Sequence, residues 1–125
     1  MAGRARSWAT PALLGAGIAL MGGCAYRASY QPRALPADEL VAVREQIRGH
    51  AKTHCGTCHQ STLPTAKPAA LAIYDLDRDD WASMLTEPRL RNGFPRRLHA
   101  RLDEGGRQQL RRFIEAELAL RSPAR

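Results

Sequence analysis

The sequence predicts a helical domain, because three stretches place their apolar residues at the spacing of one helix face. These stretches are 38–51, 79–86 and 103–118. Their apolar residues are Leu40, Val43, Ile47 and Ala51 in the first, Trp81, Met84 and Leu85 in the second, and Leu110, Phe113, Ile114 and Leu118 in the third. No strand pattern precedes Cys55.

The chain has room for one domain and a tail. It has 125 residues, of which 44% are hydrophobic, an ordinary fraction for a globular protein. Aromatic residues make up only 6%, so a core built from side chains alone would be thin. Small domains bury little surface and often need an additional stabilising group, and a large, covalently bound apolar group would serve as one.

The chain is basic, with a formal charge of +7 from 19 Lys+Arg against 12 Asp+Glu. Apart from Arg4 and Arg6, the basic residues are scattered from Arg27 to Arg125, without an aromatic-rich RNA motif or a DNA-reading helix pair. We therefore expect no nucleic-acid binding. A basic surface of this kind would instead steer an acidic protein partner or lie against anionic lipid headgroups.

Residues 1–23 predict a signal peptide for export. Arg4 and Arg6 form its charged start. The apolar run over 11–21 is too short to span a bilayer as a lasting helix.

Residues 20–24 resemble the lipobox of bacterial lipoproteins, with Met21 where that motif usually has leucine. The resemblance implies cleavage before Cys24 and a lipid anchor on this cysteine. Lipidation would also explain why Cys24 is left over from the cysteine motif described below. The alternative is cleavage nearby, for instance after Ala25, which would leave a soluble periplasmic protein.

Both alternatives export the chain, and we expect a periplasmic protein held at the membrane by its lipid. Residues 24–37, interrupted by two prolines, predict a tether, and residues 38–125 predict the folded domain. The first helix would have Asp38 as its cap or as a first-turn acid, and Asp103 would cap the last helix.

The first helix leads into Cys55, Gly56, Thr57, Cys58 and His59. At this spacing two thiols can add to the two vinyl groups of a haem, and the imidazole that follows can bind the iron. The short separation suits one helical turn, which would place both sulfur atoms on one side.

Two other interpretations use the same cysteines, a dithiol redox pair and a zinc site. A thioredoxin-like dithiol needs a strand-to-helix junction, which the sequence before Cys55 does not predict. A zinc site usually draws its ligands from two separated segments, and no second cysteine pair exists. The histidine directly after Cys58 and the export signal both favour haem.

The segment from about residue 38 to the end resembles the class I cytochrome c family: an amino-terminal helix, the Cys55–His59 motif, a loop region and a final amphipathic helix. The resemblance implies an all-α fold of about three to five helices around one covalent haem c, with the first and last helices packed together. It implies thioether links at Cys55 and Cys58, and His59 as the proximal iron ligand. It also implies single-electron transfer, with no chemistry on a substrate.

The region after the motif contains two prolines and a cluster of acidic residues, to which we assign structural roles. In the family a proline carbonyl often accepts the hydrogen of the proximal imidazole, and Pro64 or Pro68 would serve here. The acidic residues around Arg78 predict an acidic turn and the cap of the next helix; they are Asp75, Asp77, Asp79 and Asp80.

The sixth iron ligand is the point where the sequence departs from the family. Many members place a methionine before a proline shortly upstream of the last helix, where this chain has Gly93, Phe94 and Pro95. Met84 is the candidate we favour, and His99 is the alternative. A third interpretation leaves the position open near Phe94, as in a haem that binds gas or reduces peroxide.

The function we expect is that of a c-type cytochrome, a single-electron carrier in the bacterial cell envelope and not an enzyme. Its partners would be redox proteins with an acidic docking face. The alternatives are a gas-binding or peroxide-reducing haem protein and a structural zinc module.

Overall fold

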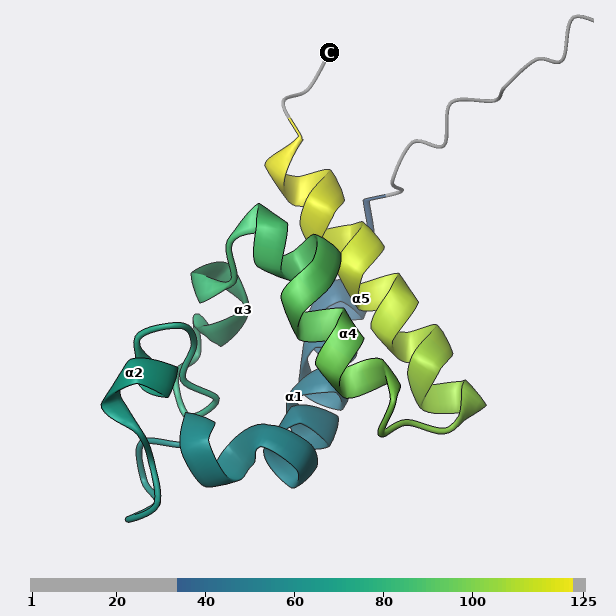
Figure 1. The fold of residues 1–125 in the computed structure, drawn as a ribbon. Helices are drawn as coiled ribbons and strands as arrows, with labels where there is room; N and C mark the ends of the chain where they lie inside the picture. The colour runs from purple at the N-terminus through teal and green to yellow at the C-terminus, as the bar shows by residue number, and fades with distance from the viewer. Residues whose placement is uncertain (1–33, 123–125) are drawn as a thin grey trace, which may run out of the picture.

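The fold consists of helices joined by short links and by two longer loops, 60–67 and 72–80 (Figure 1). The computed structural model describes residues 34–122. Its elements are α1 (Ala37–His59), α2 (Pro68–Leu71), α3 (Trp81–Met84), the π-helical η1 (Arg89–Gly93), α4 (Phe94–His99) and α5 (Glu104–Arg121). No strand occurs within the described range, so the predicted all-α fold is confirmed. The predicted signal peptide, Cys24 and most of the tether lie outside the described residues.

The first and last helices pack against each other, as predicted. Figure 1 shows α5 crossing α1, with α4 beside α5. The apolar stripes of α1 and α5 supply much of the core, because Ile47 and Phe113 are fully buried. Two contacts at the helix surface join the same pair: Arg112 pairs with Glu39, and His50 Nε2 lies 3.1 Å from Gln109 Oε1.

The two predicted helix starts have different outcomes. Asp103 caps α5, since its side chain accepts a hydrogen bond of 2.8 Å from the Gly106 backbone N–H. At α1 the capping residue is Pro36, and no side chain caps the helix. Asp38 is therefore a first-turn acid, where a negative charge still favours the helix amino terminus.

The segment between α3 and α5 was not predicted correctly. The helix expected over 79–86 covers only Trp81–Met84, and the helical run from Arg89 to His99 was missed. Its buried residues are Leu90, Phe94 and Leu98, which lie four apart on one helical face. Pro95 obscures this pattern in the sequence because a proline normally interrupts a helix. Here the widened π-helical turn precedes it, with the Phe94 N–H bonded to the Arg89 carbonyl.

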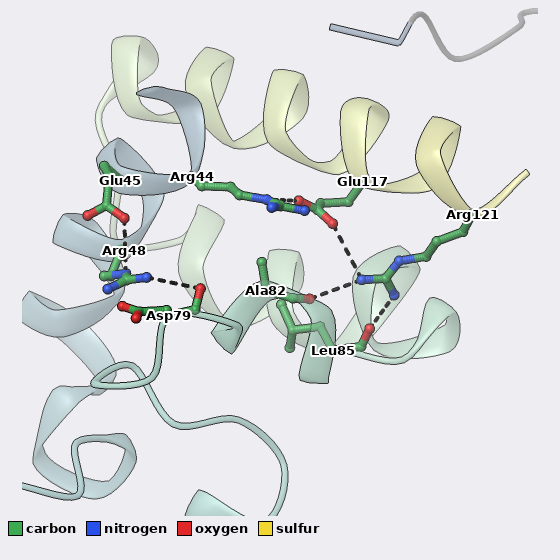
Figure 2. A network of polar contacts seen from close by, with 8 residues as sticks. All are labelled: Arg44, Glu45, Arg48, Asp79, Ala82, Leu85, Glu117 and Arg121. Carbon is green, nitrogen blue, oxygen red and sulfur yellow. Dashed lines mark hydrogen bonds and ion pairs between the residues drawn. The ribbon is translucent and has the colours of Figure 1, made fainter. Parts of the chain in front are cut away.

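A buried carboxylate joins α5 to both α1 and α3 (Figure 2). Glu117 is 1% exposed, and its Oε1 lies 2.5 Å from Arg44 Nε. Its other oxygen lies 3.5 Å from Arg121, which also donates to the carbonyls of Ala82 and Leu85. The charge of Glu117 is therefore compensated from two sides, as a buried carboxylate requires.

Candidate functional site

The cysteine motif forms the last turn of α1, which ends at His59. Cys55 and Cys58 are both free and partly buried. The turn is fixed from outside, because the Leu76 N–H donates to the His59 carbonyl at 2.8 Å and the Lys67 N–H to the Cys58 carbonyl at 3.1 Å. Residues three apart on a helix share a face, so both thiols open on the same side.

Both cysteines and His59 line one cavity of about 670 Å³, here called the large cavity. A second cavity of about 150 Å³, the small cavity, shares Cys55, His59 and Tyr74 with it. The small cavity is lined mainly by apolar side chains contributed by the middle of the chain; they are Ile73, Tyr74, Leu85 and Phe94. The structure thus brings the three predicted motif residues to one concave, largely apolar space.

One ring nitrogen of His59 is held by a backbone carbonyl. Its Nδ1 lies 3.0 Å from the Tyr74 carbonyl oxygen. Because a carbonyl can only accept, Nδ1 carries the hydrogen and Nε2 keeps its lone pair. This is the tautomer in which a histidine binds metal through Nε2, with its second nitrogen held by a carbonyl. The predicted acceptor, Pro64 or Pro68, is wrong, because residues 74–77 fold back against the end of α1 instead.

The acidic residues hold this returning segment in place. Asp75 is buried and accepts backbone hydrogen bonds from Ser61 at 3.2 Å and from Asp77 at 3.0 Å. Burial by itself raises the pKa of Asp75, but hydrogen bonds from the Ser61 side chain and from the backbone of Asp77 and Ser61 lower it on balance. The carboxylate is therefore the favoured form, and it ties the residues just after His59 to the segment that carries Tyr74.

Asp77 also ties the loop after His59 to the returning segment. It accepts from the Thr62 hydroxyl at 2.6 Å and the Thr62 N–H at 3.0 Å, and it pairs with Lys52 at 3.1 Å. These bonds hold the pKa of Asp77 well below its usual value, with Thr62 the largest cause. Asp80 pairs with Arg78 and does not cap α3 through its side chain. The sequence predicted an acidic turn, but it did not predict that Asp75 and Asp77 hold the loop after the motif.

The cations without a carboxylate partner gather at the cavities. Among residues 34–122, the Lys and Arg side chains that pair with no carboxylate are Lys67, Arg89, Arg96, Arg97, Arg101 and Arg107. All of them except Arg107 line the large or the small cavity. The space beside the motif is therefore electropositive, and it suits a molecule that is apolar and carries negative groups.

The two candidates for a sixth iron ligand lie outside the walls of both cavities. Met84 is partly buried and packs against the hydrophobic core. His99 is exposed and lines a third hollow, which shares Arg96 and Ala100 with the large cavity. Neither is among the residues that line the large or small cavity, whereas Phe94 lines the small one. The structure does not bring Met84 or His99 to the motif, and ligation by either stays a prediction.

Comparison with known proteins does not assign the chain to a family. No protein-family model, curated protein or solved structure matches the chain. Within residues 34–122, no three His, Cys, Asp or Glu side chains are grouped so that they could hold a metal ion. None of the described helices is long and apolar enough to cross a membrane.

Proposed function

We propose that this chain is a c-type cytochrome that carries single electrons in the bacterial cell envelope. Cys55 and Cys58 would hold one haem c through thioether bonds, and His59 would be its proximal iron ligand. The observation that carries the proposal is the meeting of these three side chains at one cavity. When bound, the haem supplies one-electron oxidation and reduction at its iron.

The walls of the cavities fit such a group. Leu85 and Phe94 are buried side chains that would limit water at its apolar ring. The unpaired cations, such as Arg97 and Arg101, would neutralise its two propionates. His59, held through Nδ1, would present its free nitrogen to the iron.

The test is maturation of the full-length chain in a bacterium that attaches haem outside the cytoplasm. We expect a red protein whose pigment survives acid-acetone extraction and denaturation. Cys55→Ser or Cys58→Ser should weaken or abolish this covalent attachment, whereas Cys24→Ser should leave it intact. Extraction of all pigment from the wild-type protein, or an unchanged yield in both motif variants, would contradict the proposal.

The remaining parts of the proposal concern location and partners. The chain would be exported to the periplasm and anchored to the membrane through a lipid on Cys24. The cations around the cavities would guide redox proteins with an acidic docking face. Cys24→Ser provides the test of the anchor, because the variant should move from the membrane to the soluble periplasmic fraction. Unchanged fractionation would reject lipidation.

A second candidate function is a haem protein with an open sixth position, which binds a gas or reduces peroxide. Two observations favour it: Met84 and His99 are absent from both cavity walls, and Arg89 and Arg97 stand there instead. Carbon monoxide should bind the reduced protein rapidly and tightly if the position is open. A near-infrared sulfur–iron band in the oxidised protein, lost in Met84→Leu, would establish the electron carrier with methionine ligation.

A further inference from the structure

Tyr74 contacts His59 in two independent ways. Its backbone carbonyl accepts the Nδ1–H bond, and its ring stacks on the imidazole with a centroid separation of 3.8 Å and an interplanar angle of 2°. Any residue at position 74 would supply the carbonyl. The stacking, however, needs a flat aromatic side chain.

The Tyr74 ring is itself held firmly. It is 7% exposed, and Phe94 contacts it in a T-shaped arrangement with centroids 5.6 Å apart. Its backbone N–H donates to the Ala70 carbonyl at 3.3 Å, and Leu76 binds the backbone of His59 from the other side. The ring therefore cannot follow the imidazole if the imidazole turns.

An imidazole held by one hydrogen bond can still rock about that bond. A parallel ring at van der Waals distance removes this freedom, because rotation would push one ring into the other. The hydrogen bond selects which nitrogen faces the cavity, and the stacked ring selects the plane in which that nitrogen lies.

We propose that Tyr74 is a positioning residue whose ring sets the plane of the His59 imidazole. The inference rests on the proposed function, since the fixed plane matters once His59 binds iron. The plane of an axial imidazole determines how unpaired spin spreads over a ferric haem. The proton shifts of the haem methyl groups report this spread directly, and they do not depend on electron-transfer activity.

The test compares Tyr74→Leu, which removes the flat ring, with Tyr74→Phe, which keeps it. Tyr74→Leu should compress the range of the haem methyl shifts in the oxidised protein and change its reduction potential, because the imidazole would then sample several orientations. Tyr74→Phe should restore both to wild-type values. If Tyr74→Leu does not fold, Tyr74→Met is a second variant without the flat ring, with a more flexible side chain that fills irregular gaps.

Leu110→Ala is the control for a simple loss of packing. Leu110 is fully buried in α5, and it lines neither cavity. This variant should lower the melting temperature and leave the methyl shifts unchanged. A wild-type pattern of shifts in Tyr74→Leu would overturn the inference, as would a pattern in Tyr74→Phe that matches the leucine variant.

The inference and the proposed function can fail separately. If the purified chain carries no covalent haem, the proposed function fails, and the same colourless protein still tests the stacking. The His59 ring protons should then lie upfield through the ring current of Tyr74 and return toward ordinary values in Tyr74→Leu. Unmoved His59 resonances in that variant would overturn the inference.

Discussion

Substitution of Glu117 would measure how much its buried ion pairs contribute to the packing of α5 against α1. Its carboxylate is 1% exposed and lies between Arg44 of α1 and Arg121 of α5, and Arg121 reaches on to the backbone of α3 (Figure 2). In Glu117→Ala, both cations would lose their carboxylate while staying partly enclosed. Three elements would be loosened by one substitution.

The size of the effect follows from burial. Removing one partner of a fully buried ion pair costs about 3–5 kcal/mol. The Arg44 and Arg121 side chains are 28% and 24% exposed, so each can recover some hydration. We therefore expect Glu117→Ala to lose about 2–3 kcal/mol, which corresponds to about 10–20 °C in melting temperature for a domain of this size. Glu117→Gln keeps the shape and should lose about 1–2 kcal/mol.

The assay is thermal and urea unfolding followed by circular dichroism. The matched control is Glu87→Ala, because Glu87 pairs with Arg91 at 2.7 Å with both side chains more than half exposed. An exposed pair should contribute less than about 1 kcal/mol despite its good geometry. If Glu117→Ala loses no more stability than Glu87→Ala, the reasoning from burial is refuted.

Two further predictions concern the loop after the motif and the charge around the cavities. The depressed pKa of Asp77 means that its stabilisation is present above its unfolded pKa of about 3.9 and is lost as the pH falls toward the lower folded value. Asp77→Asn should therefore flatten the decline of melting temperature below about pH 5, and an unchanged decline would contradict this role. Arg101→Gln should slow oxidation of the reduced protein by the anion ferricyanide at low salt, while Arg107→Gln should not. Stopped-flow rates that are equal for the two variants would refute steering by the cations at the cavities.

The sequence predicted the parts of the fold that depend on local pattern. The helix over the motif and the final helix follow from apolar periodicity and from the cap at Asp103. The helical run that carries Leu90 and Leu98 was missed because Pro95 stands inside it, and only the preceding π-helical turn makes room for that residue.

The sequence predicted which motif residues would come together, but it did not predict the contacts that support them. The spacing of Cys55, Cys58 and His59 fixes their common face within one helical turn. The contacts that orient His59 come from Tyr74, which lies fifteen positions along the chain. Its contribution is partly a backbone carbonyl, which every residue type has, so the sequence carries no signal for it. The Asp75 and Asp77 side chains were visible as a cluster, but their backbone partners were not.

Whether the proposed haem has a sixth ligand depends on two neighbouring residues. Leu85, which directly follows α3 in an extended conformation, lines the small cavity, while Met84, the last residue of α3, packs on the core. If the position is open, Leu85→Met should place a thioether in the cavity wall and create a near-infrared sulfur–iron band that the wild-type protein lacks. Carbon monoxide binding to the reduced variant should slow correspondingly. A wild-type protein that already shows this band and loses it in Met84→Leu would mean that α3 turns by one residue around the bound group, and the open-site alternative would be rejected.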